Sequence, residues 1–245
     1  MALAGILFDK DGTLIDFDLT WGPASVAVMR TLAKGDEAAF TRLAAANGVD
    51  PLACTIDPAS PLVAGSSASY GWLWAQALGC ADTPALHAEM DRLFALHGLD
   101  SLAPIGEPAT VLATLAEAGY RLGIATNDAE ASAVAQARQL GLSHRLEFIA
   151  GYDSGHGGKP DPGMVLAFAA HLGVDPAAVA LVGDSTHDLH AARAAGAIGI
   201  AVLTGPAPRA VLAPLADHVV GSIADLPDLL ASLAAKAAPS ARPSL

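Results

Sequence analysis

The stretch FDKDGTL, residues 8–14, ends the first apolar segment of the chain with two aspartates that stand two residues apart. Residues 3–8 are short, apolar and followed by a glycine-containing turn, which predicts a buried strand. If the strand continued, Asp9 and Asp11 would point to the same side, because side chains alternate along a strand. Two neighbouring carboxylates cost free energy unless a cation or a proton lies between them. An ordinary Asx-type turn would also explain the stretch, so the remainder of the chain must decide.

The bulk composition limits the class of protein. The chain has 245 residues, of which 53% are hydrophobic and 16% charged, with a formal net charge of −12. Charges, prolines and glycines interrupt every long apolar stretch, so we expect no membrane-spanning helix and no signal peptide. The negative charge argues against nucleic acid or an anionic membrane as partner, and it requires any phosphate site to carry its own cations. Cys54 and Cys80 form no metal-type cluster, so a reducing cytoplasm is the expected location.

Apolar segments alternate with helical patterns along most of the chain. Such alternation predicts an α/β fold, in which a parallel sheet is covered by helices on both faces. The expected strands are residues 3–8, 121–125, 147–150, 179–182, 199–203 and 218–220. The expected helices between them are residues 108–118, 129–140, 162–172, 188–195 and 226–233.

One long segment breaks this alternation. Between residues 17 and 103 the pattern is helical, with no convincing strand, and predicts helices at 24–33, 37–47, 69–78 and 84–97. We therefore expect an all-helical cap domain, residues 17–103, inserted into a core domain made of residues 1–16 and 104–235. Residues 236–245 are rich in alanine, proline and serine, which predicts a flexible C-terminal tail.

Polar side chains follow four of the predicted strands. Ligands of open parallel sheets bind at the carboxyl ends of the strands, so these side chains are expected to share one site. Carboxylates in such a group suit a hard divalent cation, while lysine and hydroxyl groups suit an anion. The four strand ends supply Asp9, Asp11 and Thr13; then Thr126, Asn127 and Asp128; then Lys159; and finally Asp184, Ser185 and Asp188.

Other motifs are not supported. Residues 153–160 resemble a phosphate loop but carry aspartate and proline where that loop needs glycine and serine or threonine. There is no dinucleotide-binding glycine pattern after the first strand and no nucleophile elbow. His187 and His190 have helical spacing beside Asp184 and Asp188, so a zinc or iron site stays conceivable, although the other ligands are all oxygen.

The four groups of residues resemble those of the haloacid dehalogenase (HAD) superfamily, in its phosphoglycolate-phosphatase-like branch. The first motif of that family, D-x-D-G-T-L, is similar to residues 9–14, and the helical insert resembles its first-position cap on a Rossmannoid core. The other motifs correspond to Thr126 with Asn127, to Lys159 in G-K-P, and to Gly183, Asp184, Ser185 and Asp188. Asp128 departs from the pattern, because that position is often lysine or another polar residue.

The resemblance implies a Mg²⁺-dependent phosphatase that works through an aspartyl-phosphate. Asp9 would be the nucleophile, since a carboxylate needs no deprotonation at neutral pH, and Asp11 would protonate the leaving alkoxide and later deprotonate water. Asp9, Asp184 and the backbone carbonyl of Asp11 would hold Mg²⁺. Asp188 would act on the metal through water or orient Lys159.

The same resemblance assigns the phosphoryl oxygens to Thr126, Lys159 and the backbone around Lys10 and Asn127. Simpler roles remain open for these groups. Thr126 could cap the following helix, and Asp184 and Asp188 could be a charge pair at a helix N-terminus. In the insert, packing rather than substrate binding is expected of Trp21, Trp72 and Trp74. Arg92 and His97 are expected to be solvated residues on helix surfaces.

The leading interpretation is a phosphatase acting on a small phosphorylated metabolite, either an organic acid such as phosphoglycolate or a sugar phosphate. A phosphotransferase such as a hexose-phosphate mutase would share the core and the catalytic pair. A catalytically silent interaction protein with the same fold is the third alternative. A dehalogenase is less favoured, because carbon–halogen displacement needs no acid in the place of Asp11. Substrate and oligomeric state are left open.

Overall fold

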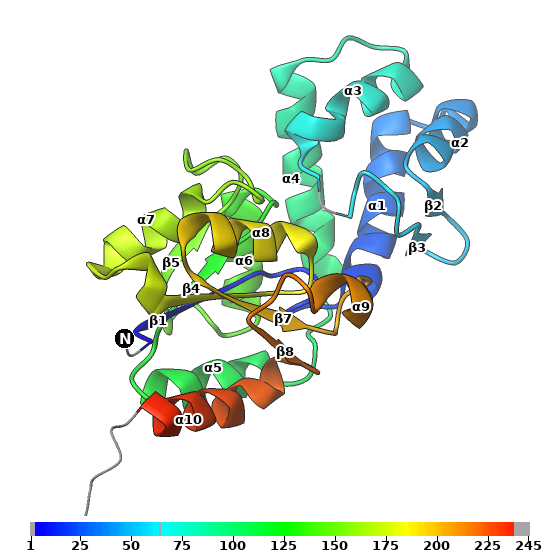
Figure 1. Cartoon of the computed structure of the whole chain (residues 1–245). Helices are drawn as coiled ribbons and strands as arrows, with labels where there is room; N and C mark the ends of the chain where they lie inside the picture. Colours follow the sequence, from blue (N-terminus) through cyan, green and yellow to red (C-terminus); the bar gives the residue numbers. More distant parts are fainter. Residues whose placement is uncertain (1–2, 64, 238–245) are drawn as a thin grey trace, which may run out of the picture.

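The computed structural model describes residues 3–63 and 65–237. A six-stranded sheet lies at its centre with the order β5-β4-β1-β6-β7-β8, and every neighbouring pair is parallel (Figure 1). The strands are β1 (Gly5–Phe8), β4 (Arg121–Ala125), β5 (Leu146–Ala150), β6 (Val179–Gly183), β7 (Ile198–Val202) and β8 (His218–Val220). The predicted parallel α/β sheet is confirmed, with boundaries shifted by at most two residues.

The four central strands, β1, β4, β6 and β7, are buried on both faces, as near-continuous apolar runs require, whereas the edge strands β5 and β8 are partly exposed. In β1, Ile6 and Phe8 point into one hydrophobic cluster and Leu7 into the other. β1 lies between β4 and β6, with Phe8 in register with Ile124 and Val182. The strand ends that carry the predicted site residues are therefore neighbours in the sheet.

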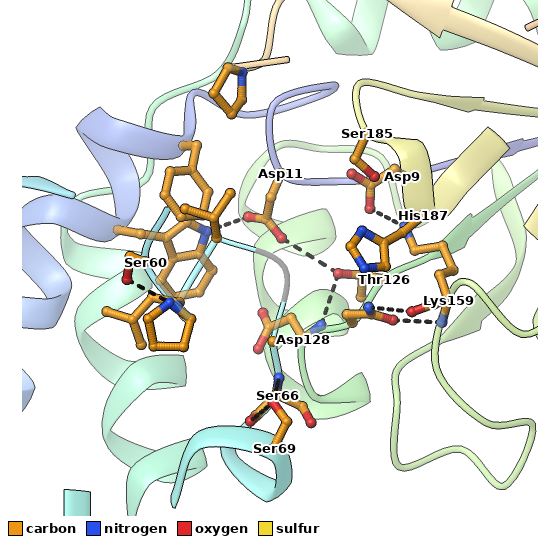
Figure 2. Close-up of a pocket in the computed structure, with 18 of the residues that line it drawn as sticks. Asp9, Asp11, Ser60, Ser66, Ser69, Thr126, Asp128, Lys159, Ser185 and His187 are labelled. Carbon is orange, nitrogen blue, oxygen red and sulfur yellow. Dashed lines mark hydrogen bonds and ion pairs between the residues drawn. The ribbon is translucent and has the colours of Figure 1, made fainter. Parts of the chain in front are cut away.

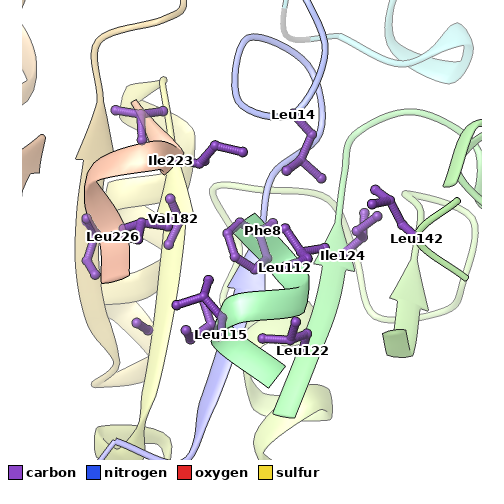
Figure 3. Close-up of a cluster of buried hydrophobic side chains, with 14 of the residues drawn as sticks. Phe8, Leu14, Leu112, Leu115, Leu122, Ile124, Leu142, Val182, Ile223 and Leu226 are labelled. Carbon is purple, nitrogen blue, oxygen red and sulfur yellow. The ribbon is translucent and has the colours of Figure 1, made fainter. Parts of the chain in front are cut away.

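Helices cover both faces of the sheet. On one face, α5 (Pro108–Glu117), α6 (Glu130–Gln139) and α10 (Leu226–Ala237) pack over Phe8 and its neighbours (Figure 3). On the other face, α7 (Gly163–Leu172) and α8 (Thr186–Ala195) pack over Leu7. Three short elements escaped sequence analysis because three or four residues give no periodic signal: α9 (Arg209–Leu212) and the 3₁₀ turns at Pro176–Ala178 and Ile223–Asp225.

Residues 17–103, called the cap segment below, surround a hydrophobic cluster of their own that includes Trp74 and Met90. They rise from one end of the sheet (Figure 1). The helices are α1 (Phe17–Ala33), α2 (Glu37–Ala46), α3 (Ser67–Leu78) and α4 (Pro84–Asp100). The expectation of an all-helical insert is wrong in one detail, because β2 (Val49–Asp50) and β3 (Thr55–Ile56) form an antiparallel pair. Two-residue strands are too short to show an alternating pattern.

Helix α1 begins seven residues earlier than expected. The side chain of Asp16 caps it by accepting a hydrogen bond from the backbone N–H of Leu19 (2.9 Å). Pro23 lies inside the helix, although proline is more typical of a first turn. The early start places Trp21 on the helix, next to the strand ends.

Two connectors join the cap segment to the sheet, and they lie side by side. The backbone N–H of Asp16 donates to the carbonyl of Ala103 (2.8 Å), and Ile15 forms a bridge with Pro104. Thr20 accepts hydrogen bonds from Ala103 N–H (3.1 Å) and from the hydroxyl of Ser101 (2.7 Å).

At the other end of the chain, the expected tail from 236 is only partly described. Residues 236 and 237 still belong to α10, and residues 238–245 lie outside the described residues. Across the described part of the chain, no helix is both long enough and apolar enough to span a membrane.

Candidate active site

Asp9 follows the last residue of β1 directly and is held in place by the neighbouring strand. Its backbone N–H donates to the carbonyl of Val182 at the end of β6 (2.8 Å). The carboxylate is buried and accepts a hydrogen bond from Nζ of Lys159 (2.5 Å) (Figure 2). The strand end thus presents a carboxylate that is already paired with a cation.

Three buried carboxylates form a candidate metal centre. Oxygen atoms of Asp9, Asp184 and Asp188 all lie within 4.8 Å of one another. Gly12, at φ 75°, leaves room for the group, since a Cβ atom there would collide with the carboxylate of Asp184. Burial raises the pKa values of Asp9 and Asp184, and their acidic neighbours raise them further, while Lys159 acts in the opposite direction. Three carboxylates, of which two contact the same lysine, supply oxygen donors that fit a hard divalent cation such as Mg²⁺.

Lys159 is the cation of this centre. Its Nζ donates to Asp9 (2.5 Å) and to Asp188 (2.6 Å). Burial alone would lower the pKa of Lys159, but the two carboxylates raise it above its ordinary value, so the ammonium stays charged. The side-chain amide of Asn127 fixes the lysine's backbone by donating to its carbonyl (2.9 Å) and accepting from its N–H (2.8 Å).

Asp188 lies in the first turn of α8 and has both carboxylate oxygens engaged. Oδ1 accepts from Lys159, and Oδ2 accepts from the backbone N–H (3.1 Å) and the hydroxyl (2.6 Å) of Ser185. The two residues form a capping box. Asp188 therefore lies at the helix N-terminus and also contacts Lys159, which is compatible with both expected roles, and its part in catalysis stays a prediction.

The side chain of Asp11 does not belong to the carboxylate cluster. It accepts hydrogen bonds from Nζ of Lys10 (2.9 Å) and from the indole N–H of Trp21. A third, at 3.5 Å, comes from the hydroxyl of Thr126 (Figure 2). Asp11 also lines the cavity between the strand ends and the cap segment. Coordination of a metal by its backbone carbonyl stays a prediction.

Lys10 was expected to act through its backbone, yet its side chain holds two loops together. The buried Nζ lies 2.8 Å from Asp11 and 3.1 Å from Asp128, and 4.7 Å from the centroid of the Trp21 ring. Burial lowers the pKa of Lys10, and Asp11 and Asp128 more than reverse this effect. Burial likewise raises the pKa of Asp128, which Lys10 opposes. The sequence signal for this contact is the pair of opposite charges, Lys10 and Asp128, at the ends of two adjacent strands.

Thr126 follows β4, and its backbone N–H donates to the carbonyl of Ala150 (3.0 Å). The helix-capping alternative for its side chain is wrong. Ala129 is the N-cap of α6, and the side chain of Asp153 accepts from the backbone N–H of Glu130 (2.8 Å). The hydroxyl of Thr126 accepts from Asp128 N–H (3.1 Å) instead, and it lines the cavity beside Asp11.

The remaining candidate residues differ in whether they line the cavity. His187 lines the cavity, but among the described residues no histidine belongs to a metal-type cluster, which leaves the zinc or iron alternative unsupported. Arg92 pairs with Glu89 on the surface of α4 and His97 pairs with Asp100, and neither lines the cavity. Trp74 is fully buried, whereas Trp72 is 53% exposed and so does not pack as expected.

The cavity has a volume of about 830 Å³ and extends from the strand ends into the cap segment. Its far wall could not be predicted from the sequence. Tyr152, after β5, donates to Asp91 of α4 (2.7 Å) and shares a hydrogen bond with Ser67 of α3 (2.9 Å). A tyrosine in a polar loop gives no motif, so only the folded chain reveals this link.

The strand ends of the parallel sheet gather carboxylates, a lysine and a threonine, an arrangement that suits an α/β enzyme with a cation and an anionic substrate. The model of the haloacid dehalogenase-like hydrolase family matches residues 3–196, and the chain belongs to this family. The expected resemblance is thereby confirmed.

Individual relatives agree with this assignment. A phosphoglycolate phosphatase from Rhodospirillum rubrum is 34% identical over 194 residues, which cover 78% of this chain and 76% of the relative. A probable phosphatase, IndB, from Dickeya dadantii is 30% identical over 202 residues, covering 82% and 81%. A crystal structure of a predicted phosphoglycolate phosphatase from Haemophilus somnus has the same fold, with a TM-score of 0.67, 18% identity, and coverage of 93% of this chain and 97% of that one. The chain is thus similar to phosphoric monoester hydrolases.

Proposed function

We propose that the protein is a Mg²⁺-dependent phosphatase that hydrolyses a small phosphomonoester through a phosphoryl-aspartate on Asp9. The observation that carries the proposal is the arrangement around Asp9. Its carboxylate meets Lys159, Asp184 and Asp188 on one side, and the neighbouring Asp11 faces the same cavity with separate hydrogen-bond partners. The family and the phosphatase relatives support this reaction class.

In the first step, an oxygen of Asp9 attacks phosphorus as the bond between phosphorus and the leaving oxygen breaks. Asp11 donates its proton to that oxygen, so the product leaves as an alcohol. Lys159 and the hydroxyl of Thr126 hold the phosphoryl oxygens, together with backbone N–H groups near Lys10 and Asn127. Each of these groups borders the strand ends where the transferred phosphoryl group would lie.

In the second step, water attacks the phosphorus of phosphoryl-Asp9, and Asp11 accepts the proton of that water. The bond between phosphorus and the oxygen of Asp9 breaks, and inorganic phosphate leaves. Asp9 and Asp184 would hold the Mg²⁺ ion, with Asp188 acting through water or through Lys159. When bound, the ion supplies positive charge that offsets the negative charge of the phosphoryl oxygens.

The position of residues 17–103 beside the cavity supports a role in substrate selection. We assign them to a cap domain that selects the substrate, and residues 1–16 and 104–235 to the catalytic core domain. Separate hydrophobic clusters support this division, since Trp74 and Met90 belong to one cluster and Phe8 to another. The two free cysteines support a reducing cytoplasm as the location. The expected partner is a small phosphorylated metabolite.

The test uses the purified chain and p-nitrophenyl phosphate. We expect Mg²⁺-dependent release of inorganic phosphate, abolished by a chelator and restored by added Mg²⁺. A phosphotransferase would protect its phosphoryl-aspartate from water and release phosphate slowly, and a silent protein would release none. Hydrolysis that persists in excess chelator would contradict the role given to the ion.

A further inference from the structure

The two ends of the cavity have different chemistry. One end contains Asp9, Lys159, Ser185 and His187, which lie close together at the strand ends (Figure 2). Hydroxyl groups and apolar side chains line the other end, which the cap segment forms. This far end includes Ser60, Ser66, Ser69, Pro61, Leu62, Val63, Tyr70 and Phe94.

Positive charge is confined to the end of the cavity that contains Asp9 and Lys159, called the phosphoryl end below. Among the described residues that line the cavity, Lys159 is the one lysine or arginine, and both Asp9 and Asp188 already pair with it. Lys10 does not line the cavity, and its ammonium pairs with Asp11 and Asp128. The far end therefore offers no ammonium or guanidinium group to a substrate.

The far end instead carries a negative charge. Asp91 of α4 lines the cavity, and one of its carboxylate oxygens accepts a hydrogen bond from Tyr152 (2.7 Å). Burial raises the pKa of Tyr152 to about 12, and burial raises the pKa of Tyr70 as well, so both present neutral hydroxyl groups at physiological pH. Arg92, the next residue on α4, pairs with the exposed Glu89 and does not offset Asp91 in the cavity.

The size of the cavity also argues against a very small leaving group. Pockets of roughly 300–1,000 Å³ hold drug-sized ligands, and this cavity measures about 830 Å³. Glycolate would leave most of that space to water, and among the described lining residues its carboxylate would find no lysine or arginine other than Lys159. A hydroxylated alcohol with an apolar face would fill the space and satisfy the serine and tyrosine hydroxyls.

We propose that the substrate is the phosphomonoester of an uncharged, hydroxyl-bearing alcohol of the sugar or polyol class, and that Asp91 disfavours leaving groups that carry a carboxylate. The proposal rests on the phosphatase function proposed above and specifies its substrate class. Like charges brought together in a partly closed site oppose binding, which gives selectivity without new attractive contacts.

Matched substrate pairs test the proposal with the full-length chain and Mg²⁺. Glycerol 3-phosphate and 3-phosphoglycerate differ in a hydroxymethyl group against a carboxylate, and glucose 6-phosphate and 6-phosphogluconate form a second pair. We expect kcat/KM to favour the uncharged member of each pair at least about tenfold, mainly through KM. The proposal is overturned if the enzyme hydrolyses p-nitrophenyl phosphate but kcat/KM shows no such preference within the two substrate pairs. A preference for the carboxylate members would overturn it as well. Failure to hydrolyse even p-nitrophenyl phosphate would instead remove the phosphatase function itself.

Two variants assign the selectivity to Asp91. Asp91→Asn keeps a side chain that can accept from Tyr152 but removes the charge, and it should reduce the preference for the uncharged member several-fold. Glu89→Gln is the matched control, since it removes one negative charge from the exposed face of the same helix. Its preference should equal that of the wild type. An unchanged preference in Asp91→Asn, or equal changes in both variants, would contradict the role of Asp91.

Discussion

The indole N–H of Trp21, on the first helix of the cap segment, donates a hydrogen bond to Oδ1 of Asp11, on the loop that follows β1. The same ring lies 4.7 Å from Nζ of Lys10, which also donates to Asp11. The carboxyl group assigned to proton transfer is therefore positioned by residues of both parts of the molecule. A general acid must point at its proton acceptor to be effective, which gives these contacts a measurable consequence.

Trp21→Phe should lower kcat more than it raises KM, because the ring volume is largely kept while the hydrogen bond to Asp11 is lost. General acid–base catalysis contributes roughly 10²–10⁴-fold, and we expect a loss of about tenfold with an alkyl phosphate such as glycerol 3-phosphate. The loss should be smaller with p-nitrophenyl phosphate, whose leaving group needs no proton. Trp72→Phe is the control, since Trp72 is half-exposed on α3 and does not line the cavity. Equal losses with both substrates would argue for a purely structural role.

Lys10 and Asp128 should be energetically coupled, because Lys10 is buried, Asp128 is half-buried, and their charged groups lie 3.1 Å apart. Lys10→Met leaves Asp128 and Asp11 without their shared cation, which should cost roughly 3–5 kcal/mol of stability. Adding Asp128→Asn should restore part of that loss, with a coupling free energy of about 1–3 kcal/mol in a double-mutant cycle. Urea unfolding of the wild type, the two single variants and the double variant measures this coupling free energy. Additive losses would mean that the pair is not coupled.

Asp9→Asn should abolish phosphate release while the fold persists. Removal of an attacking group typically costs at least about a thousandfold in kcat, whereas Lys159 keeps its second partner, Asp188, in the variant. Thermal unfolding followed by circular dichroism should remain cooperative. Activity above a hundredth of the wild-type value, after contamination is excluded, would rule out Asp9 as the nucleophile.

Gly22→Ala should destabilise the cap segment, although alanine normally favours a helix by about 1 kcal/mol over glycine. A Cβ atom at Gly22 would collide with the backbone carbonyl of Cys54, in the turn between β2 and β3. We expect a net loss of about 1–3 kcal/mol in denaturant unfolding. Leu19→Ala, on the exposed side of the same helix, should change stability by less than about 0.5 kcal/mol. An unchanged free energy of unfolding in Gly22→Ala would show that the turn between β2 and β3 can shift freely.

The core and the carboxylates at the strand ends could be predicted because they depend on local signals. The strand that ends at Phe8 is an apolar run, and parallel sheets bring strand ends together, so Asp9, Thr126, Lys159 and Asp184 could be placed near one another from sequence. Their catalytic roles remain predictions.

The contacts between the cap segment and the strand ends could not be predicted. Trp21 reaches Asp11 only because α1 continues through Pro23 and begins at Phe17, against the usual position of proline. Asp91 and Tyr152 are 61 residues apart and meet only in the folded chain. Tertiary contacts of this kind leave no periodicity or motif in the sequence. By contrast, the contact between Lys10 and Asp128 lies within the core, where opposite charges at two adjacent strand ends give a signal in the sequence.

The paired connectors at Asp16 and Ala103 fix the entry and the exit of the cap segment at one place on the core, because the backbone of one connector donates to the backbone of the other. Trp21 lies five residues beyond Asp16, and Asp91 lies twelve residues before Ala103 on α4. A substitution that separates the two connectors would therefore displace both the indole that contacts Asp11 and the carboxylate that contacts Tyr152.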